Sequence, residues 1–217
     1  MRRSSASVLM LLFVCLGCCR ASDLFVVSAY HRPDPFGSFV ASDLAGASWN
    51  HSIQLTSARG GYVSFQLVVK SDPAVKDCKL SIEFKQPVEV YREWFHFNTP
   101  DKHYYPDALI PIHVPFSFQM PDPENAIQGQ KVRAFWVDVW IAADTKPGVY
   151  HGRAQLTDGS ARKTVPFSIS VSAAQIPAQD VLNVDSNSYG MGWLQAQYPK
   201  ALAGSGRAKE DEQFRLI

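Results

Sequence analysis

The chain has 217 residues and a formal net charge of +1, from 21 basic and 20 acidic residues. These charges are scattered, and no basic stripe or run of like charge indicates binding to nucleic acid or to an anionic membrane surface. Aromatic residues make up 12% of the chain and include five tryptophans, which in a β-protein serve either in the core or as stacking surfaces for sugar rings.

The first 21 residues have the layout of a secretory signal peptide. Arg2 and Arg3 precede an apolar run from Val8 to Gly17, and small residues follow before Ser22. The run is too short to span a bilayer permanently, and no later segment reaches the ~20 apolar residues that a spanning helix needs. We expect a mature protein that begins near Ser22, is secreted or periplasmic, and has no integral membrane segment.

The cysteines are unevenly distributed. Three of the four lie in or beside the signal, at Cys15, Cys18 and Cys19. Cys78 is therefore alone in the mature domain, where no intrachain disulfide can form, and we expect it to be a buried strand residue. Cys18 follows Leu16 and Gly17, an arrangement similar to the end of a bacterial lipobox. Acylation of Cys18 would tether the product to a membrane.

The first half of the mature chain alternates in the manner of β-strands. We predict strands at Leu24–Tyr30, at Ile53 and Leu55, at Leu80–Phe84 and at Val88–Asn98, with a loop rich in Pro, Gly and Asp from Pro33 to Gly46. The clearest strand is Gly61–Lys70, which follows a turn at Arg59-Gly60-Gly61. Its predicted inward residues are Val63, Phe65, Leu67 and Val69, and its predicted outward residues are Tyr62, Ser64, Gln66 and Lys70.

The segment from Thr99 to Gln130 lacks this alternation and is rich in proline. Because proline removes a donor from a sheet ladder, we predict a long loop that is functional or packed against another part of the protein.

Period two returns at Arg133–Ile141. Phe135, Val137, Val139 and Ile141 point one way, and Ala134, Trp136, Asp138 and Trp140 point the other. A turn follows at Asp144–Gly148, and a second strand begins at Val149, with Tyr150, Gly152, Ala154 and Leu156 on one face. We predict that these two strands pair antiparallel.

A last strand is predicted from the alternation of Val165, Phe167, Ile169 and Val171. About eight short strands indicate an all-β fold, an immunoglobulin-like antiparallel β-sandwich over residues 22–172. Residues 173–180 have the composition of a linker. The run Val181–Val184 and the helical composition of residues 208–217 predict the truncated start of a (β/α)₈ barrel over residues 181–217.

No cluster of catalytic or metal-ligating residues stands out. The histidines are spread singly, so no metal site and no cofactor are predicted. The acidic groups Asp122 with Glu124, and Glu210 with Asp211 and Glu212, are interpreted as loop and helix-surface residues. Asp138 has two interpretations: an exposed acid between sugar-stacking tryptophans, or an acid that pairs with an Arg or with backbone donors under a neighbouring domain.

Four motifs in this order carry a family resemblance, and they are quoted as they stand in the chain: RGGYVSFQLVV (59–69), YPDALIP (105–111), AFWVDV (134–139) and KPGVYHG (146–152). Together they resemble the N-terminal β-sandwich of glycoside hydrolase family 123 and its relatives, over about residues 23–190. Arg59-Gly60-Gly61 departs from the Arg-Asn-Glu expected in that family.

The resemblance implies a secreted enzyme in which the sandwich packs on a (β/α)₈ barrel that binds the glycan substrate. The implied substrate is β-linked N-acetylgalactosamine, cleaved by a substrate-assisted retaining mechanism in which an adjacent Asp-Glu pair orients the acetamide and supplies acid and base catalysis. No position in this chain matches that pair, so no catalytic residue is assigned. Asn187 and Tyr189 follow the first predicted barrel strand and are candidate substrate-binding residues, or they only shape the first βα loop.

Two interpretations without catalysis stay open. The sandwich could be a carbohydrate-binding module that holds sugar through Trp136, Trp140 or the Tyr104-Tyr105 loop. It could also be a structural extracellular module without a sugar site.

Overall fold

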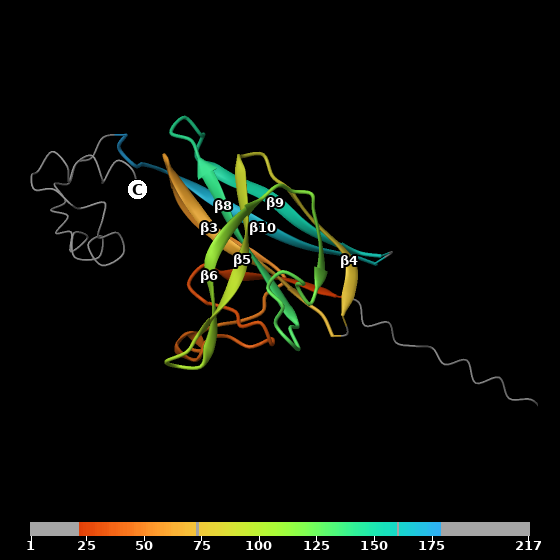
Figure 1. Cartoon of the computed structure of the whole chain (residues 1–217). Helices are drawn as coiled ribbons and strands as arrows, with labels where there is room; N and C mark the ends of the chain where they lie inside the picture. The colour runs from red at the N-terminus through yellow and green to blue at the C-terminus, as the bar shows by residue number, and fades with distance from the viewer. Residues whose placement is uncertain (1–21, 73, 160, 179–217) are drawn as a thin grey trace, which may run out of the picture. The chain divides into compact units, whose positions relative to one another are not determined.

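The computed structural model describes residues 22–72, 74–159 and 161–178, which form two five-stranded sheets (Figure 1). The first sheet has the spatial order β1 (Asp23–Ser28), β3 (Gly61–Lys70), β8 (Val132–Ile141), β5 (Val88–Asn98) and β6 (His103–Ile112). The second has the order β2 (Ile53–Arg59), β10 (Ala161–Gln175), β9 (Gly148–Asp158), β4 (Val75–Glu83) and β7 (Phe116–Met120). A short 3₁₀ helix, η1, spans Ala41–Asp43. Within the described ranges, no helix is long and apolar enough to cross a membrane.

A continuous apolar core lies between the two sheets. The predicted inward residues of β3 and β8 are buried except for Val63, which is partly buried, and Phe65, Leu67, Phe135 and Val137 are all at 0% exposure. The second sheet contributes Leu80, Leu156 and Phe167, and the Phe65 and Phe167 ring centroids are 4.9 Å apart. The alternation in the sequence therefore predicted the buried face of these strands correctly, and the all-β sandwich is confirmed.

The predicted antiparallel pairing of β8 with β9 is wrong. β8 pairs with β3 and β5 in the first sheet, whereas β9 pairs with β10 and β4 in the second. The turn between β8 and β9 crosses from one sheet to the other, so the apolar faces of the two strands meet across the core. A buried face on each strand is compatible with either arrangement, because alternation reports burial and not the neighbour. The sandwich also contains one parallel pair, β2 with β10.

The proline-rich segment is not one long loop. It contains β6 and β7, which are the outermost strands of the first and the second sheet. An edge strand has one side without a ladder partner, so it accommodates proline more readily than a central strand does. Tyr104 and Tyr105, expected in a loop, lie on β6.

The C-terminal end of the sandwich lies further along the chain than the composition indicated. β10 continues to Gln175, into the segment 173–180 expected to be a linker, and the Ile176 N–H donates to the Arg59 carbonyl. The predicted signal peptide with Cys18, and the predicted barrel start over residues 181–217, lie outside the described residues.

The outer face of the first sheet, which points away from the core, is half covered. The segments around Phe39 and Ile127 pack on Val68, Phe95 and Ala134 to form a second apolar cluster. No described segment packs in this way over the other half of the face, which carries Trp136, Asp138 and Trp140 of β8.

Gln66, which was predicted to point outward into solvent, lies under this cover and is 1% exposed. Its Nε2 donates to the carbonyls of Ser28 and His31, at 2.8 Å each. Tertiary cover therefore buries a position that strand alternation alone assigns to the surface.

Candidate functional site

Two places on the sandwich gather polar side chains: a cavity at one end of the core, and the uncovered half of the first sheet's outer face. The predicted substrate-binding residues Asn187 and Tyr189 lie outside the described residues, and neither place depends on them.

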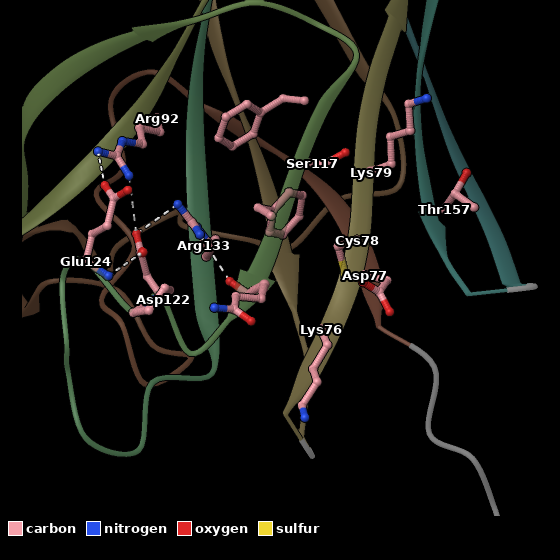
Figure 2. A pocket seen from close by; sticks show the side chains of 14 residues that line it. Lys76, Asp77, Cys78, Lys79, Arg92, Ser117, Asp122, Glu124, Arg133 and Thr157 are labelled. Carbon is pink, nitrogen blue, oxygen red and sulfur yellow. Dashed lines mark hydrogen bonds and ion pairs between the residues drawn. The ribbon is translucent and has the colours of Figure 1, made fainter.

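The cavity has a volume of about 570 Å³ and opens between β5 and β8 on one side and β4 and β7 on the other. Figure 2 shows Arg92 and Arg133 turned toward Asp122 and Glu124, with Cys78 on the neighbouring strand β4. Arg133 occupies the inward position that starts the buried face of β8, and its side chain is 6% exposed. A guanidinium this deep in a sandwich requires acceptors.

The two arginines and the two carboxylates of the segment 122–124 are paired with one another in the cavity. Arg133 Nη2 lies 2.8 Å from Asp122 Oδ2, and its Nη1 donates to the Gln119 carbonyl at 3.0 Å. Arg92 Nη2 lies 2.5 Å from Glu124 Oε2. The Asp122 backbone N–H donates to Gln130 Oε1 at 2.6 Å. This network ties the segment 121–131 to the end of the core, and Asp122 and Glu124 act in it as partners of the two arginines.

Cys78 confirms its expected role as a buried strand residue. It lies on β4 and is 1% exposed. Burial, with a smaller contribution from the nearby Asp158 carboxylate, raises the pKa of the thiol to about 11. At neutral pH the side chain is a thiol, which is a poor nucleophile and a poor metal ligand.

Asp138 lies at the centre of the uncovered outer face and accepts two hydrogen bonds on one oxygen. Ser64 Oγ donates to Oδ1 at 2.5 Å, and Trp136 Nε1 donates to the same atom at 2.7 Å. Its partners are thus a neighbouring hydroxyl and an indole, and not the Arg or backbone donors that one interpretation anticipated. The other interpretation, an exposed acid between sugar-stacking tryptophans, agrees with the position of Asp138 between Trp136 and Trp140, but the side chain is half-buried.

Glu93 on β5 was missed by the sequence reasoning. It is 7% exposed, and its Oε1 has no hydrogen-bond partner within the described residues. Burial raises the pKa of this carboxyl to about 8, so it is largely protonated at neutral pH. In the sequence, Glu93 is two residues from both Tyr91 and Phe95, so it lies on the outward face of β5 with them. Phe95, two residues further along the same face of β5, belongs to the covered apolar cluster.

No metal site is built in the part of the chain that the structure describes, where no three His, Cys, Asp or Glu side chains are grouped closely enough to hold an ion.

Several solved structures have a similar fold. A family 123 glycoside hydrolase from Clostridium perfringens, an enzyme of glycolipid glycan hydrolysis, is similar at a TM-score of 0.54 and 15% identity over 72% of this chain. This chain spans only 28% of that enzyme's length. At this identity the likeness shows a shared fold.

Two smaller modules are similar at a lower level. A PapD-like domain of human CEP192 matches with a TM-score of 0.31 and 12% identity, over 59% of this chain and 84% of that domain. The cupredoxin domain of amoB from Nitrosocaldus yellowstonii matches with a TM-score of 0.28 and 15% identity, over 57% of this chain and 64% of that one. No protein-family model matches the chain, and no curated protein is similar to it in sequence.

Proposed function

We propose that this chain is the non-catalytic N-terminal portion of a secreted glycoside hydrolase related to family 123, which acts on β-linked N-acetylhexosamine glycans, in particular those of N-acetylgalactosamine. The observation that carries the proposal is the likeness of the two-sheet topology to a family 123 enzyme over 72% of this chain and 28% of that one. Such a ratio is expected if a catalytic domain follows the sandwich.

The chemistry of the described residues supports a non-catalytic sandwich and a separate catalytic barrel. Hydrolysis of this linkage needs one group to protonate the leaving oxygen and another to orient the acetamide, both in one pocket. Asp122 and Glu124 are paired with arginines, and Asp138 lies on an open sheet face beside Glu89, whose carboxylate accepts a hydrogen bond from the Tyr91 hydroxyl. Catalysis therefore belongs to a barrel, where Asn187 and Tyr189 would line the first βα loop.

The test compares two secreted products on an aryl β-N-acetylgalactosaminide. The chain as printed should give no turnover, and a polypeptide extended through the barrel should give turnover that is lost when an adjacent Asp-Glu pair in the barrel is replaced by Asn-Gln. Hydrolysis by the printed chain that disappears with Asp138→Asn or Glu124→Gln would contradict the proposal. N-terminal mass analysis of the exported product tests secretion, because an intact Met1 would exclude signal cleavage.

A further inference from the structure

Aromatic side chains form two pairs on the uncovered outer face of the first sheet. Strand register places Tyr62 of β3 beside Trp140 of β8, and Trp136 of β8 beside Tyr91 of β5. The Tyr62 and Trp140 ring centroids are 4.9 Å apart, and Tyr62 is 54% exposed. Trp136 and Trp140 are four residues apart on one strand, so the two pairs are separated by about 13 Å along β8.

A polar row lies between the two pairs and consists of Ser64, Asp138 and Glu89, which are register partners on β3, β8 and β5. Asp138 is held in place because Ser64 and Trp136 both donate to its Oδ1. Its Oδ2 receives no hydrogen bond within the described residues and is free to accept one from a ligand. Asp138 is therefore an acceptor with a preset direction.

The face becomes concave at its β5 side. A hollow of about 460 Å³ begins at Glu89 and Tyr91 and continues along Pro111 and His113 of the β5–β6 end. Tyr91 donates its hydroxyl to Glu89 Oε2 at 2.8 Å, which raises the pKa of Tyr91 and fixes the ring at the mouth of this hollow. Small-molecule sites share this combination of a recess, aromatic walls and a few oriented polar groups.

We propose that this face, made of Tyr62, Trp140, Asp138, Trp136 and Tyr91, is a glycan-binding site of the sandwich. A pyranose ring has an apolar face that stacks on Trp or Tyr and hydroxyl groups that donate hydrogen bonds, so one ligand satisfies both the ring pairs and Asp138 Oδ2. The site accepts neutral pyranosides that extend across the strands from Tyr62 toward the hollow. It goes beyond the proposed function, because it requires no catalytic domain.

The test is a titration of the full chain with N,N′-diacetylchitobiose and with methyl β-N-acetylgalactosaminide, followed by tryptophan fluorescence and by calorimetry. We expect a saturable fluorescence change with at least one probe, because Trp136 and Trp140 lie in the site. Trp140→Ala and Asp138→Asn should each weaken binding about tenfold, the size of effect that 1.4 kcal/mol produces. Turnover is not measured, so a negative result leaves the proposed function untouched.

Two exposed tyrosines give a matched control. Tyr62→Ala should weaken binding, whereas Tyr30→Ala should not, since Tyr30 is 88% exposed but lies outside this face. Thermal unfolding of each variant shows whether its fold is intact. The proposal is overturned by the absence of a saturable change with both probes, or by equal affinity of the native chain and the Trp140→Ala and Asp138→Asn variants. Saturable binding of arginine amide in place of both sugars would also overturn it, and would identify the face as a protein-docking surface.

Discussion

The two faces of β8 use charged side chains in opposite ways. On the inner face, Arg133 is closed in by Asp122, by the Gln119 carbonyl and by the Phe118 ring, whose centroid lies 5.3 Å from the guanidinium carbon. On the outer face, Asp138 accepts two hydrogen bonds on one oxygen and keeps the other available. A saturated buried ion pair holds the fold, and a partly satisfied acid at the surface is able to bind. Changes at these two positions should therefore separate stability from binding.

The largest effect is expected at Arg133. Arg133→Met removes one partner of a buried pair and leaves the Asp122 carboxylate without its main counterion, which should lower the free energy of unfolding by roughly 3–5 kcal/mol. Urea denaturation measures this. The double variant Arg133→Met with Asp122→Leu should recover part of the loss, because it removes both charges. A double variant no more stable than Arg133→Met would contradict this account of the pair.

Glu93 should make stability depend on pH. Its folded pKa of about 8 exceeds the ordinary value of 4.5, so the unfolded chain releases this proton first as the pH rises. The relative stabilisation is complete below pH 4.5 and is lost as the pH rises toward 8. The loss of unfolding free energy amounts to roughly 3 kcal/mol by pH 7. Glu93→Gln should remove this slope in urea denaturation between pH 4 and 8. Glu89→Gln, on the same strand but exposed, should preserve it, and an unchanged slope in Glu93→Gln would rule out this source.

A substitution at Gly152 of β9 tests how tightly the second sheet packs against the core. A Cβ at this position would lie 2.6 Å from Phe84 Cδ2 and closer still to the Phe167 ring. Gly152→Ala should therefore destabilise the domain by roughly 1–3 kcal/mol, which is measurable as a drop in Tm. Gly61→Ala is the matched control, because its Cβ would clash only with the terminal carbon of the half-exposed Ile176 side chain, which can move aside. Equal losses in the two variants would argue against the ring contacts as the cause.

The smallest effect on stability is expected at Asp138. Asp138→Asn keeps an oxygen that can accept from Ser64 and Trp136 and loses only the charge, so the free energy of unfolding should change by about 1 kcal/mol or less. A loss as large as that of Arg133→Met in the same urea experiment would mean that Asp138 is a structural acid, and the contrast between the two faces of β8 would fail.

The sequence predicted the strands where alternation was strong and failed where a different rule applied. Gly61–Lys70 and Val88–Asn98 agree with the structure at both ends, because both are central strands with a buried apolar face. β6 and β7 were missed because the prolines were interpreted as excluding a central strand, and the possibility of strands at the sheet edges was not considered. For the site, the sequence identified Trp136, Asp138 and Trp140 as sharing one face, but it could not identify Tyr91 as the neighbour of Trp136.

The sequence by itself determined which residues of β3, β8, β9 and β10 face the core, since strand periodicity depends only on local backbone geometry. Only the tertiary structure decided which strands are neighbours, because hydrogen-bonded pairing joins segments far apart in the chain and leaves little trace in local alternation. It also decided which half of the first sheet's outer face is covered. The Phe39 and Ile127 segments pack on Val68, Phe95 and Ala134 in the half where Gln66 and Glu93 are buried, while Tyr62, Asp138 and Trp140 keep access to solvent because no described residues pack over them in this way.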